Sequence, residues 1–348
     1  MAKKNRKIEV IDLFSGVGGL TYGLRKSGLS VLAGIDNDES CAYAYEKNNA
    51  AKFISADISE FDFKELNKIY SKGSVRVLVG CAPCQPFSSH AFKLRKDASD
   101  VRWNLLDHFI RGIKVVKPDI VSMENVRGVT KTDVFKNFVG ELEKLNYKVD
   151  WKVVYAPNYG VPQNRSRLIL LASKLGEILI PEETHTKENY ISVGDVIREL
   201  PKLKAGEMSD LDQLHQAKKL EHINEKRILQ SKPGGTWRDW DKNLLPNCYK
   251  KDSGQSYMSV YGRMRWENVS PTITTQFTSY GSGRFGHPEQ NRALSIREGA
   301  LLQTFPFDYD FGDFTSSKLS RHIGNAVPPQ LGVVIGRQIK KHLEAYGK

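Results

Sequence analysis

Short apolar segments alternate with amphipathic ones along the first half of the chain, and this alternation restricts the possible folds most. Apolar runs typical of strands cover residues 8–14, 30–35, 75–79, 120–123, 148–155 and 167–172. Helical periodicity covers residues 20–26, 41–48, 100–116 and 134–145. Strands and helices in alternation predict an α/β fold with a doubly wound, mostly parallel sheet. Such sheets bind ligands beyond the carboxyl ends of their strands.

The character of the sequence changes after about Lys174. Segments become irregular, and arginines interleave with aromatic residues near Arg238, Arg263 and Arg265. We expect a second, smaller domain here, either with ordinary surface arginines or with a face that contacts nucleic acid. The amphipathic helix expected at about residues 330–343 must pack on the sheet. The expected division is residues 1–178 with 318–348 in the large domain and 179–317 in the small one.

Composition narrows the class of protein. The 348 residues carry a net charge of +12, so an acidic polymer is a plausible partner, although many basic proteins bind none. Four cysteines make no disulfide framework in a chain of this length, which favours a reducing compartment. Near the N-terminus, Glu9 and Asp12 interrupt the apolar run, so we expect neither a signal peptide nor a membrane span.

A glycine-rich turn follows the first strand and opens the first helix, with Gly16, Gly18 and Gly19 in it. Glycines let the backbone approach a ligand closely. Asp36 and Asp57 follow the next strands, where acidic side chains can hold ribose hydroxyls or an adenine edge. Each aspartate alone is equally well explained as a helix cap or turn residue. As a set, these residues favour an adenosyl-type cofactor.

Cys84 lies between Pro83 and Gln85, in a turn directly after the apolar run 75–79. A sulfur held at the end of a buried strand is well placed to act as a nucleophile. Its spacing from Cys81 also fits a redox or zinc pair, but the sequence offers no further zinc ligands at suitable spacing and no thioredoxin-like context. We therefore expect Cys81 to be a buried strand residue, and Cys41 and Cys248 to be structural.

Three charged residues follow other strands. Glu124 ends the run 120–123, where partial burial of a carboxyl lets it carry or share a proton. Arg165 and Arg167 alternate at a strand start, so both side chains point to one face. We expect both arginines near Glu124, although a surface ion pair for Glu124 and a solvated edge for the arginines are the simpler alternatives.

These motifs resemble those of the DNA (cytosine-5)-methyltransferases, particularly the bacterial restriction–modification enzymes. The resemblance covers nearly the whole chain and rests on six motifs in the family's order. They are residues 14–19 (FSGVGG), 83–86 (PCQP), 124–126 (ENV), 163–167 (QNRSR), 297–306 (RE, then QTFP) and 324–328 (GNAVP). The resemblance implies a Rossmann-like methyltransferase domain with a smaller target-recognition domain.

The resemblance also implies a cofactor, S-adenosyl-L-methionine, with S-adenosyl-L-homocysteine as its product. Phe14 would stack on the adenine, Asp36 would hold the ribose, and Asp57 would bind the adenine amino group. Asn37 stands where the family often has a bulkier apolar residue. The implied cofactor contacts are Phe14, Ser15, Gly16, Gly18, Gly19, Asp36, Asn37, Asp57, Ile58, Pro83, Leu105, Asn325 and Ala326. No metal is implied.

In the implied mechanism, the Cys84 thiolate adds to C6 of an extruded cytosine, and C5 then attacks the methyl group. Glu124 would bind N3 and the exocyclic amine. Arg167 would contact O2, and Arg165 would brace Glu124. The implied contacts to DNA are Gln85, Ser88, Arg238, Arg263 and Arg265.

The implied partners are double-stranded DNA and a cognate restriction endonuclease that acts on the same site. The resemblance further implies a monomeric enzyme in the cytoplasm, on the nucleoid. Two other functions remain open from the sequence. An RNA cytosine-5 methyltransferase would use the same pocket, although a sizeable variable domain favours a reader of DNA grooves. A catalytically silent DNA-binding protein would not need Cys84, Glu124, Arg165 and Arg167 together.

Overall fold

The computed structural model describes residues 6–82 and 105–346, which fall into two units. The first unit comprises residues 1–159, 166–184 and 326–348, and the second comprises 160–165 and 185–325. These boundaries differ from the expected ones in three places. The segments 160–165 and 318–325 belong to the second unit, and residues 179–184 belong to the first, because their contacts lie there.

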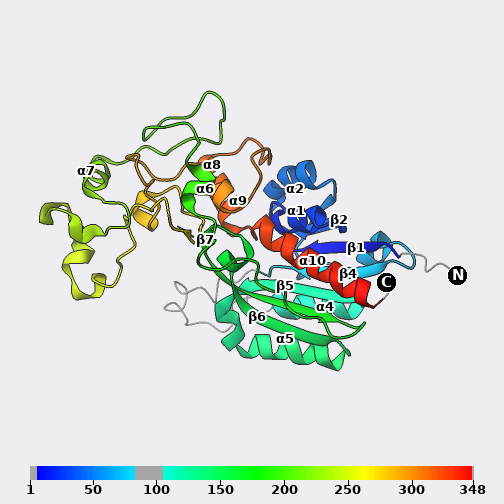
Figure 1. The fold of residues 1–348 in the computed structure, drawn as a ribbon. Helices are drawn as coiled ribbons and strands as arrows, with labels where there is room; N and C mark the ends of the chain where they lie inside the picture. Colours follow the sequence, from blue (N-terminus) through cyan, green and yellow to red (C-terminus); the bar gives the residue numbers. More distant parts are fainter. Residues whose placement is uncertain (1–5, 83–104, 347–348) are drawn as a thin grey trace. The chain divides into compact units, whose positions relative to one another are not determined.

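A seven-stranded sheet forms the centre of the first unit, in the order β3-β2-β1-β4-β5-β8-β6 (Figure 1). The strands are β1 (Ile8–Leu13), β2 (Ser30–Asp36), β3 (Lys52–Ser55), β4 (Val75–Gly80), β5 (Ile120–Val126), β6 (Lys148–Tyr155) and β8 (Ser166–Ser173). The pairs from β3 to β5 are parallel, whereas β8 runs antiparallel to β5 and β6. The predicted doubly wound α/β sheet is confirmed, with an antiparallel edge.

Helices cover both faces of this sheet (Figure 1). They are α1 (Gly19–Lys26), α2 (Ala42–Asn49), α3 (Lys64–Ile69), α4 (Leu105–Val116), α5 (Asp133–Lys144) and α10 (Pro329–Ala345), with 3-10 turns η1 (Glu39–Cys41), η5 (Arg127–Lys131) and η6 (Ala156–Tyr159). On one face α10 packs closely on α1. The approach is so close that a Cβ at Gly23 of α1 would lie 2.0 Å from the Pro329 carbonyl oxygen of α10. On the other face Ile11 and Leu13 share a core with Phe109 of α4 and Phe138 of α5.

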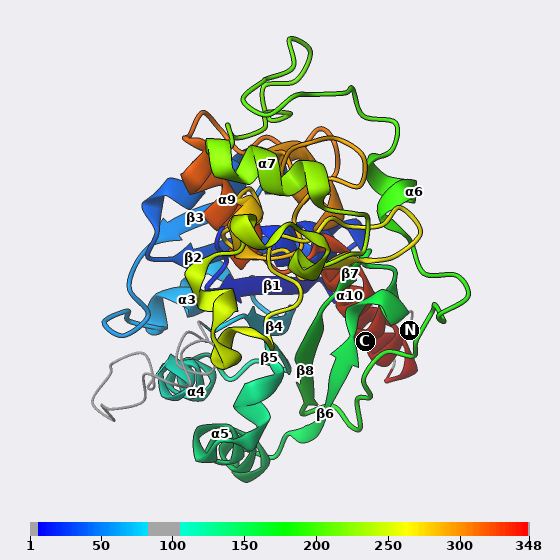
Figure 2. The ribbon, with the colours of Figure 1, turned by 90° about the vertical axis from the view of Figure 1, so that its left-hand side faces the viewer.

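The second unit has little regular structure, and Figure 2 shows long irregular connections around its helices. Its elements are β7 (Gln163–Asn164), α6 (Val193–Ile197), α7 (His222–Gln230), η7 (Trp237–Asp239), η8 (Lys242–Leu244), η9 (Asn247–Lys250), η10 (Asp252–Gly254), β9 (Ser270–Pro271), η11 (Tyr280–Ser282), α8 (Ile296–Leu302) and α9 (Ser316–Asn325). Strand β7 pairs with β9, which explains why residues 160–165 belong to this unit.

Buried polar contacts hold the second unit together. Arg292 and Glu298 are both fully buried, and Arg292 Nη2 lies 2.7 Å from Glu298 Oε1. Burial alone would raise the pKa of Glu298, but its bonds to Arg292 hold that pKa at about 2. Gln163 Nε2 donates to Gln303 Oε1 over 2.7 Å, which ties β7 to the end of α8. Across residues 6–82 and 105–346, no helix has the length and apolar composition of a membrane span.

Candidate active site

The predicted site residues of the first unit lie along one edge of the sheet. Strands β1, β4 and β5 are parallel neighbours, with Leu13 opposite Gly80 and Gly80 opposite Met123. The segments after these three strands therefore leave the sheet side by side. They are the glycine-rich turn, the segment that leads to Cys84, and the segment after Val126, with Glu124 near the end of β5 itself. Their shared position is what the strand pattern predicts for a ligand site.

The glycine-rich turn has a backbone that few side chains allow. Phe14 has φ 59°, and Gly16 and Gly18 have φ 51° and 88°, all in the left-handed region. A Cβ at Gly18 would lie 2.3 Å from Asn49 Nδ2, so only glycine fits there. A Cβ at Gly16 would meet nothing within 4 Å. The turn thus packs against α2 on one side and leaves its backbone open at Gly16.

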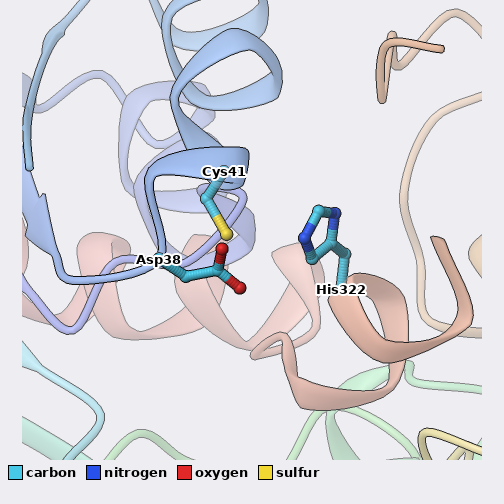
Figure 3. Close-up of side chains that lie close together, drawn as sticks. All are labelled: Asp38, Cys41 and His322. Atoms are coloured by element: carbon cyan, nitrogen blue, oxygen red, sulfur yellow. The ribbon is translucent and has the colours of Figure 1, made fainter. Parts of the chain in front are cut away.

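Asp36 connects the end of β2 to this turn. Its Oδ2 accepts a hydrogen bond from the Gly16 amide and its Oδ1 accepts one from the Asp38 amide, each over 2.9 Å. Burial raises the pKa of this carboxyl in spite of these bonds. Figure 3 shows the next turn of the chain, where the Cys41 sulfur lies beside the Asp38 carboxylate. His322, also drawn there, belongs to α9 of the second unit.

The other predicted cofactor residues of the first unit differ in exposure. Asn37 and Asp57 are exposed, and Ile58 is buried. The Asp57 carboxylate accepts hydrogen bonds from the Ser59 hydroxyl and amide, which lower its pKa. Leu105 is half-buried at the start of α4. These positions leave the Asp57 carboxylate charged and accessible from solvent.

A buried polar chain, absent from the sequence-based predictions, lies behind the glycine-rich turn. The Thr21 hydroxyl donates to Asp12 Oδ2 over 2.7 Å and lies 3.1 Å from the Tyr45 hydroxyl. Burial raises the pKa of Asp12 to about 7, against the effect of the Thr21 bond, and the charge of Asp36 raises it further. Within the described residues, Asp12 Oδ1 and Ser15 Oγ are buried without a hydrogen-bond partner. Two such atoms beside an open backbone suit a polar ligand.

Glu124 is 2% exposed, and two side chains approach its carboxylate. Cys81 Sγ donates to Oε2 over 2.8 Å, and Arg167 Nε lies 3.2 Å from Oε1. The Arg167 contact is an ion pair that is not aligned as a hydrogen bond, so Oε1 accepts none within the described part of the chain. The predicted contact between Arg167 and Glu124 is therefore present. The predicted place of Cys81 in a buried strand is wrong, because it follows β4, is partly exposed and bonds to Glu124.

Asn125 fixes the segment that precedes Cys84. Its Nδ2 donates to the Ala82 carbonyl over 3.2 Å, and its Oδ1 accepts from the Val126 amide over 2.8 Å. The motif of residues 124–126 was the sequence signal for this role, although it did not reveal the partner. Cys84 itself lies outside the described residues, as do Pro83, Gln85 and Ser88.

The remaining predicted residues belong mainly to the second unit. Arg165 is buried there, and its predicted contact with Glu124 stays a prediction. Asn325 is exposed at the end of α9, and Ala326 begins the last segment of the first unit. Cys248 is exposed with a free thiol, which contradicts a structural role, whereas Cys41 is buried as expected.

The three arginines predicted to contact DNA have different environments. Arg238 and Arg265 are exposed, as a contact requires. Arg263 is 4% exposed, and its guanidinium donates to the carbonyls of Ser231, His287, Gln290 and Ile228 and to the Asn291 side chain. With these acceptors around it, Arg263 is a structural brace, and the predicted DNA contact is wrong for this residue.

Comparisons with known proteins agree with this geometry. The model of the C-5 cytosine-specific DNA methylase family matches residues 8–341. The chain is 54% identical to the Type II methylase M.HgiDII of Herpetosiphon aurantiacus, over 96% of each protein. It is 34% identical to the Type II methyltransferase M1.HphI of Haemophilus parahaemolyticus, over 95% of this chain and 86% of that protein.

Solved structures share the fold at low sequence identity. A prophage-encoded protein of Escherichia coli, described as a DNA modification methyltransferase, aligns with a TM-score of 0.75 at 20% identity, over 97% of this chain and 100% of that one. A Spodoptera frugiperda DNMT2 variant aligns with a TM-score of 0.65 at 17% identity, over 98% of this chain and 100% of that one. With the family match across residues 8–341, the chain belongs to the C-5 cytosine-specific DNA methylases.

Proposed function

We propose that this protein transfers a methyl group from S-adenosyl-L-methionine to carbon 5 of a cytosine in a specific sequence of duplex DNA. The observation that carries the proposal is the environment of Glu124. Its carboxyl is almost completely buried, at the end of the strand next to the one that leads into Cys84. Arg167 and Cys81 hold it in place, and Oε1, which accepts no hydrogen bond from the residues that the structure describes, can accept one from a substrate.

The glycine-rich turn supports the cofactor in this proposal. The backbone is open at Gly16, and among the described residues Ser15 Oγ and Asp12 Oδ1 have no hydrogen-bond partner. Together with the acceptors on Asp36 and Asp57, they suit a ligand with hydroxyl and amino groups. When bound, S-adenosyl-L-methionine supplies an electrophilic methyl group and leaves as S-adenosyl-L-homocysteine. The proposed contacts are Phe14, Ser15, Gly16, Gly18, Gly19, Asp36, Asn37, Asp57, Ile58, Pro83, Leu105, Asn325 and Ala326.

The protein's own groups then activate the cytosine. The Cys84 thiolate adds to C6, which makes C5 nucleophilic, and after methylation the C5 proton leaves and the thiolate is expelled. Glu124 binds N3 and the exocyclic amine, Arg167 contacts O2, and Arg165 supports Glu124. The cytosine must leave the duplex to reach these groups, at a cost of a few kcal/mol. Gln85, Ser88, Arg238 and Arg265 contact the DNA around it.

The biological setting follows from the relatives with Type II names. We propose that the protein acts as a monomer on the nucleoid, in the cytoplasm, and protects DNA from a cognate restriction endonuclease. Bisulfite sequencing of genomic DNA from expressing cells is expected to show full methylation of one short sequence. Unmethylated cytosines throughout would contradict the proposed activity.

A direct assay compares methyl transfer from labelled S-adenosyl-L-methionine to unmethylated duplex DNA and to tRNA. We expect transfer to DNA only, and transfer to tRNA alone would instead identify an RNA methyltransferase. The Glu124→Gln variant is expected to lose about a hundredfold or more in methylation rate, since general acid–base groups contribute about 10²–10⁴-fold. Its cofactor affinity is expected to stay within about twofold.

The matched control is Glu143→Gln, which makes the same change at an exposed position on α5. Its methylation rate is expected to equal that of the unmodified protein. Equal losses of rate and of cofactor affinity in Glu124→Gln would overturn the role given to Glu124.

A further inference from the structure

A tight turn at residues 231–236 lies against the chain segment that contains Arg263 and Arg265. The Gly234 amide donates to the Arg263 carbonyl over 3.0 Å, and Pro233 pairs with Arg263 as an isolated bridge. Gly234 has φ 72°, which is the left-handed region. The buried guanidinium of Arg263 donates to the Ser231 carbonyl over 2.8 Å at the start of the turn. Arg263 therefore holds the turn through both its side chain and its backbone.

The side chain of Arg265 lies directly across Gly234. A Cβ at Gly234 would lie 1.8 Å from Arg265 Nε, so any other residue would displace the arginine. Arg265 Nε lies 3.3 Å from the Pro233 carbonyl oxygen, to which it donates. The residue is exposed, and within the described residues its two Nη groups have neither a hydrogen bond nor an ion pair. The guanidinium is thus held on its Nε side while its Nη groups remain accessible.

Arg284 supports the same turn from a more buried position. Its Nη1 donates to the Gly235 carbonyl over 2.6 Å, and a Cβ at Gly262 would lie 2.8 Å from that nitrogen. Arg265 lies against Gly234 and Arg284 binds the carbonyl of the next residue, so the two guanidiniums are neighbours. Burial lowers the pKa of Arg284, and the charge of Arg265 lowers it further. In the part of the chain that the structure describes, neither forms an ion pair with a carboxylate. Two adjacent cations without a counter-charge suit an electronegative ligand.

We propose that Arg265 reads a guanine in the recognised DNA sequence through its two Nη groups, with Gly234 and Arg284 as the residues that position it. The proposal rests on the proposed function, because it takes duplex DNA as the substrate. A guanidinium fork matches the O6 and N7 acceptors that guanine presents in the major groove. A phosphate would also accept such a fork. However, a contact to phosphate does not require the arginine side chain to be held against Gly234. Reading a base requires that the guanidinium point in a fixed direction.

The test uses duplex DNA with a randomised segment, methylated by the full-length protein and then sequenced after bisulfite treatment. The unmodified protein is expected to select one short sequence that contains a guanine read by Arg265. Arg265→Ala is expected to accept other base pairs at that single position, with discrimination there about ten- to a hundredfold lower. Gly234→Val, which displaces the same guanidinium, is expected to relax the same position.

Lys232→Ala is the matched control, because it removes one exposed cation from the same turn without changing a guanidinium. It is expected to keep the full sequence preference. Should Arg265→Ala methylate too slowly for sequencing, its binding to duplexes with each base pair of the site replaced in turn gives the same comparison. Circular dichroism first establishes that the variant is folded.

Three outcomes would overturn the proposal. An unchanged sequence preference in Arg265→Ala would exclude a reading role. Equal losses on all sequences, with a salt dependence weaker by about one counterion, would identify a phosphate contact instead. Loss of discrimination at every position in the folded variant would indicate a general role in docking. Absence of any methylation by the unmodified protein would instead contradict the proposed function.

Discussion

In the first unit, Glu124 is positioned by β5, and its neighbours come from the strands on either side, Cys81 after the parallel strand β4 and Arg167 from the antiparallel strand β8. In the second unit, Arg265 is positioned by a turn in a segment with few regular elements, and it depends on a glycine and a carbonyl. The strand register fixes several groups relative to one another, as a covalent reaction requires. The turn fixes one side chain and is easily altered. We infer that the first unit carries the groups that act on the cytosine, Cys84, Glu124 and Arg167, and that the second unit carries the choice of sequence.

The largest expected effect is on the rate of methylation, without an effect on DNA binding. Cys84→Ser is expected to lower the methylation rate by about a thousandfold or more, because the hydroxyl is a much weaker nucleophile than a thiolate. Sequence-specific DNA binding, measured by fluorescence anisotropy, is expected to stay within about twofold. A methylation rate near that of the unmodified protein would mean that another residue is the nucleophile. It would also contradict the assignment of the chemistry to the first unit.

The next effect distinguishes a structural residue, Arg263, from a residue proposed to read a base, Arg265, within the second unit. Arg263→Ala leaves several buried carbonyls without a donor, and we expect it to destabilise this unit by about 3 kcal/mol. Arg265→Ala, two residues away and exposed, is expected to change stability by less than about 0.5 kcal/mol. Urea unfolding followed by tryptophan fluorescence measures both, since Trp237, Trp240 and Trp266 lie in this unit. Equal stabilities of the two variants would contradict the role of Arg263.

A pH dependence is expected from Asp12 in the first unit. Its pKa is raised to about 7, so the folded state binds the proton more tightly than the unfolded chain does. The stabilisation is complete below the unfolded pKa and is lost as the pH rises through 7. Between pH 5 and pH 8 the stability of the protein should fall by about 1–3 kcal/mol relative to Asp12→Asn. A difference that stays constant with pH would show that Asp12 is ionised throughout.

The smallest effect concerns the contact between Cys81 and Glu124. Cys81→Ala removes the hydrogen bond to Oε2 of Glu124. We expect the methylation rate to fall about tenfold, which corresponds to the loss of one hydrogen bond to a charged group. Cys81→Ser keeps a donor and should restore most of the rate at saturating DNA. The measurement is kcat for both variants with the same duplex. An increase in KM without a change in kcat would mean that Cys81 does not position Glu124.

The sequence predicted the first unit better than the second for a physical reason. Runs such as residues 75–79 and 120–123 are apolar because both faces of a central strand are buried, so periodicity reveals them. The antiparallel edge was not predicted, although a signal was present. Parallel neighbours need a long crossover, whereas β6 and β8 are joined only by residues 156–165. Strand β3 and helix α3 were also missed, because β3 has only four residues and α3 is short and mostly polar.

In the candidate site, too, the sequence predicts positions at strand ends better than positions in irregular segments. The positions of Gly16, Asp36 and Glu124 follow from strand ends, so the sequence placed them at one edge. Arg263 and Arg265 look alike in the sequence, yet one is buried and the other exposed. Their difference depends on carbonyls from distant segments such as His287 and Gln290, which no local pattern reveals. The contact of Cys81 likewise depends on the pairing of β4 with β5.

The central claim is a transient bond between Cys84 and a cytosine held by Glu124. Duplex DNA in which the target cytosine is replaced by 5-fluorocytosine tests it, because fluorine at C5 blocks the loss that would release the sulfur. Incubation with S-adenosyl-L-methionine is expected to give a protein–DNA adduct that survives denaturation, with the added mass on the peptide that contains Cys84. An adduct on the Cys81 side chain, or none with an active preparation, would contradict the account.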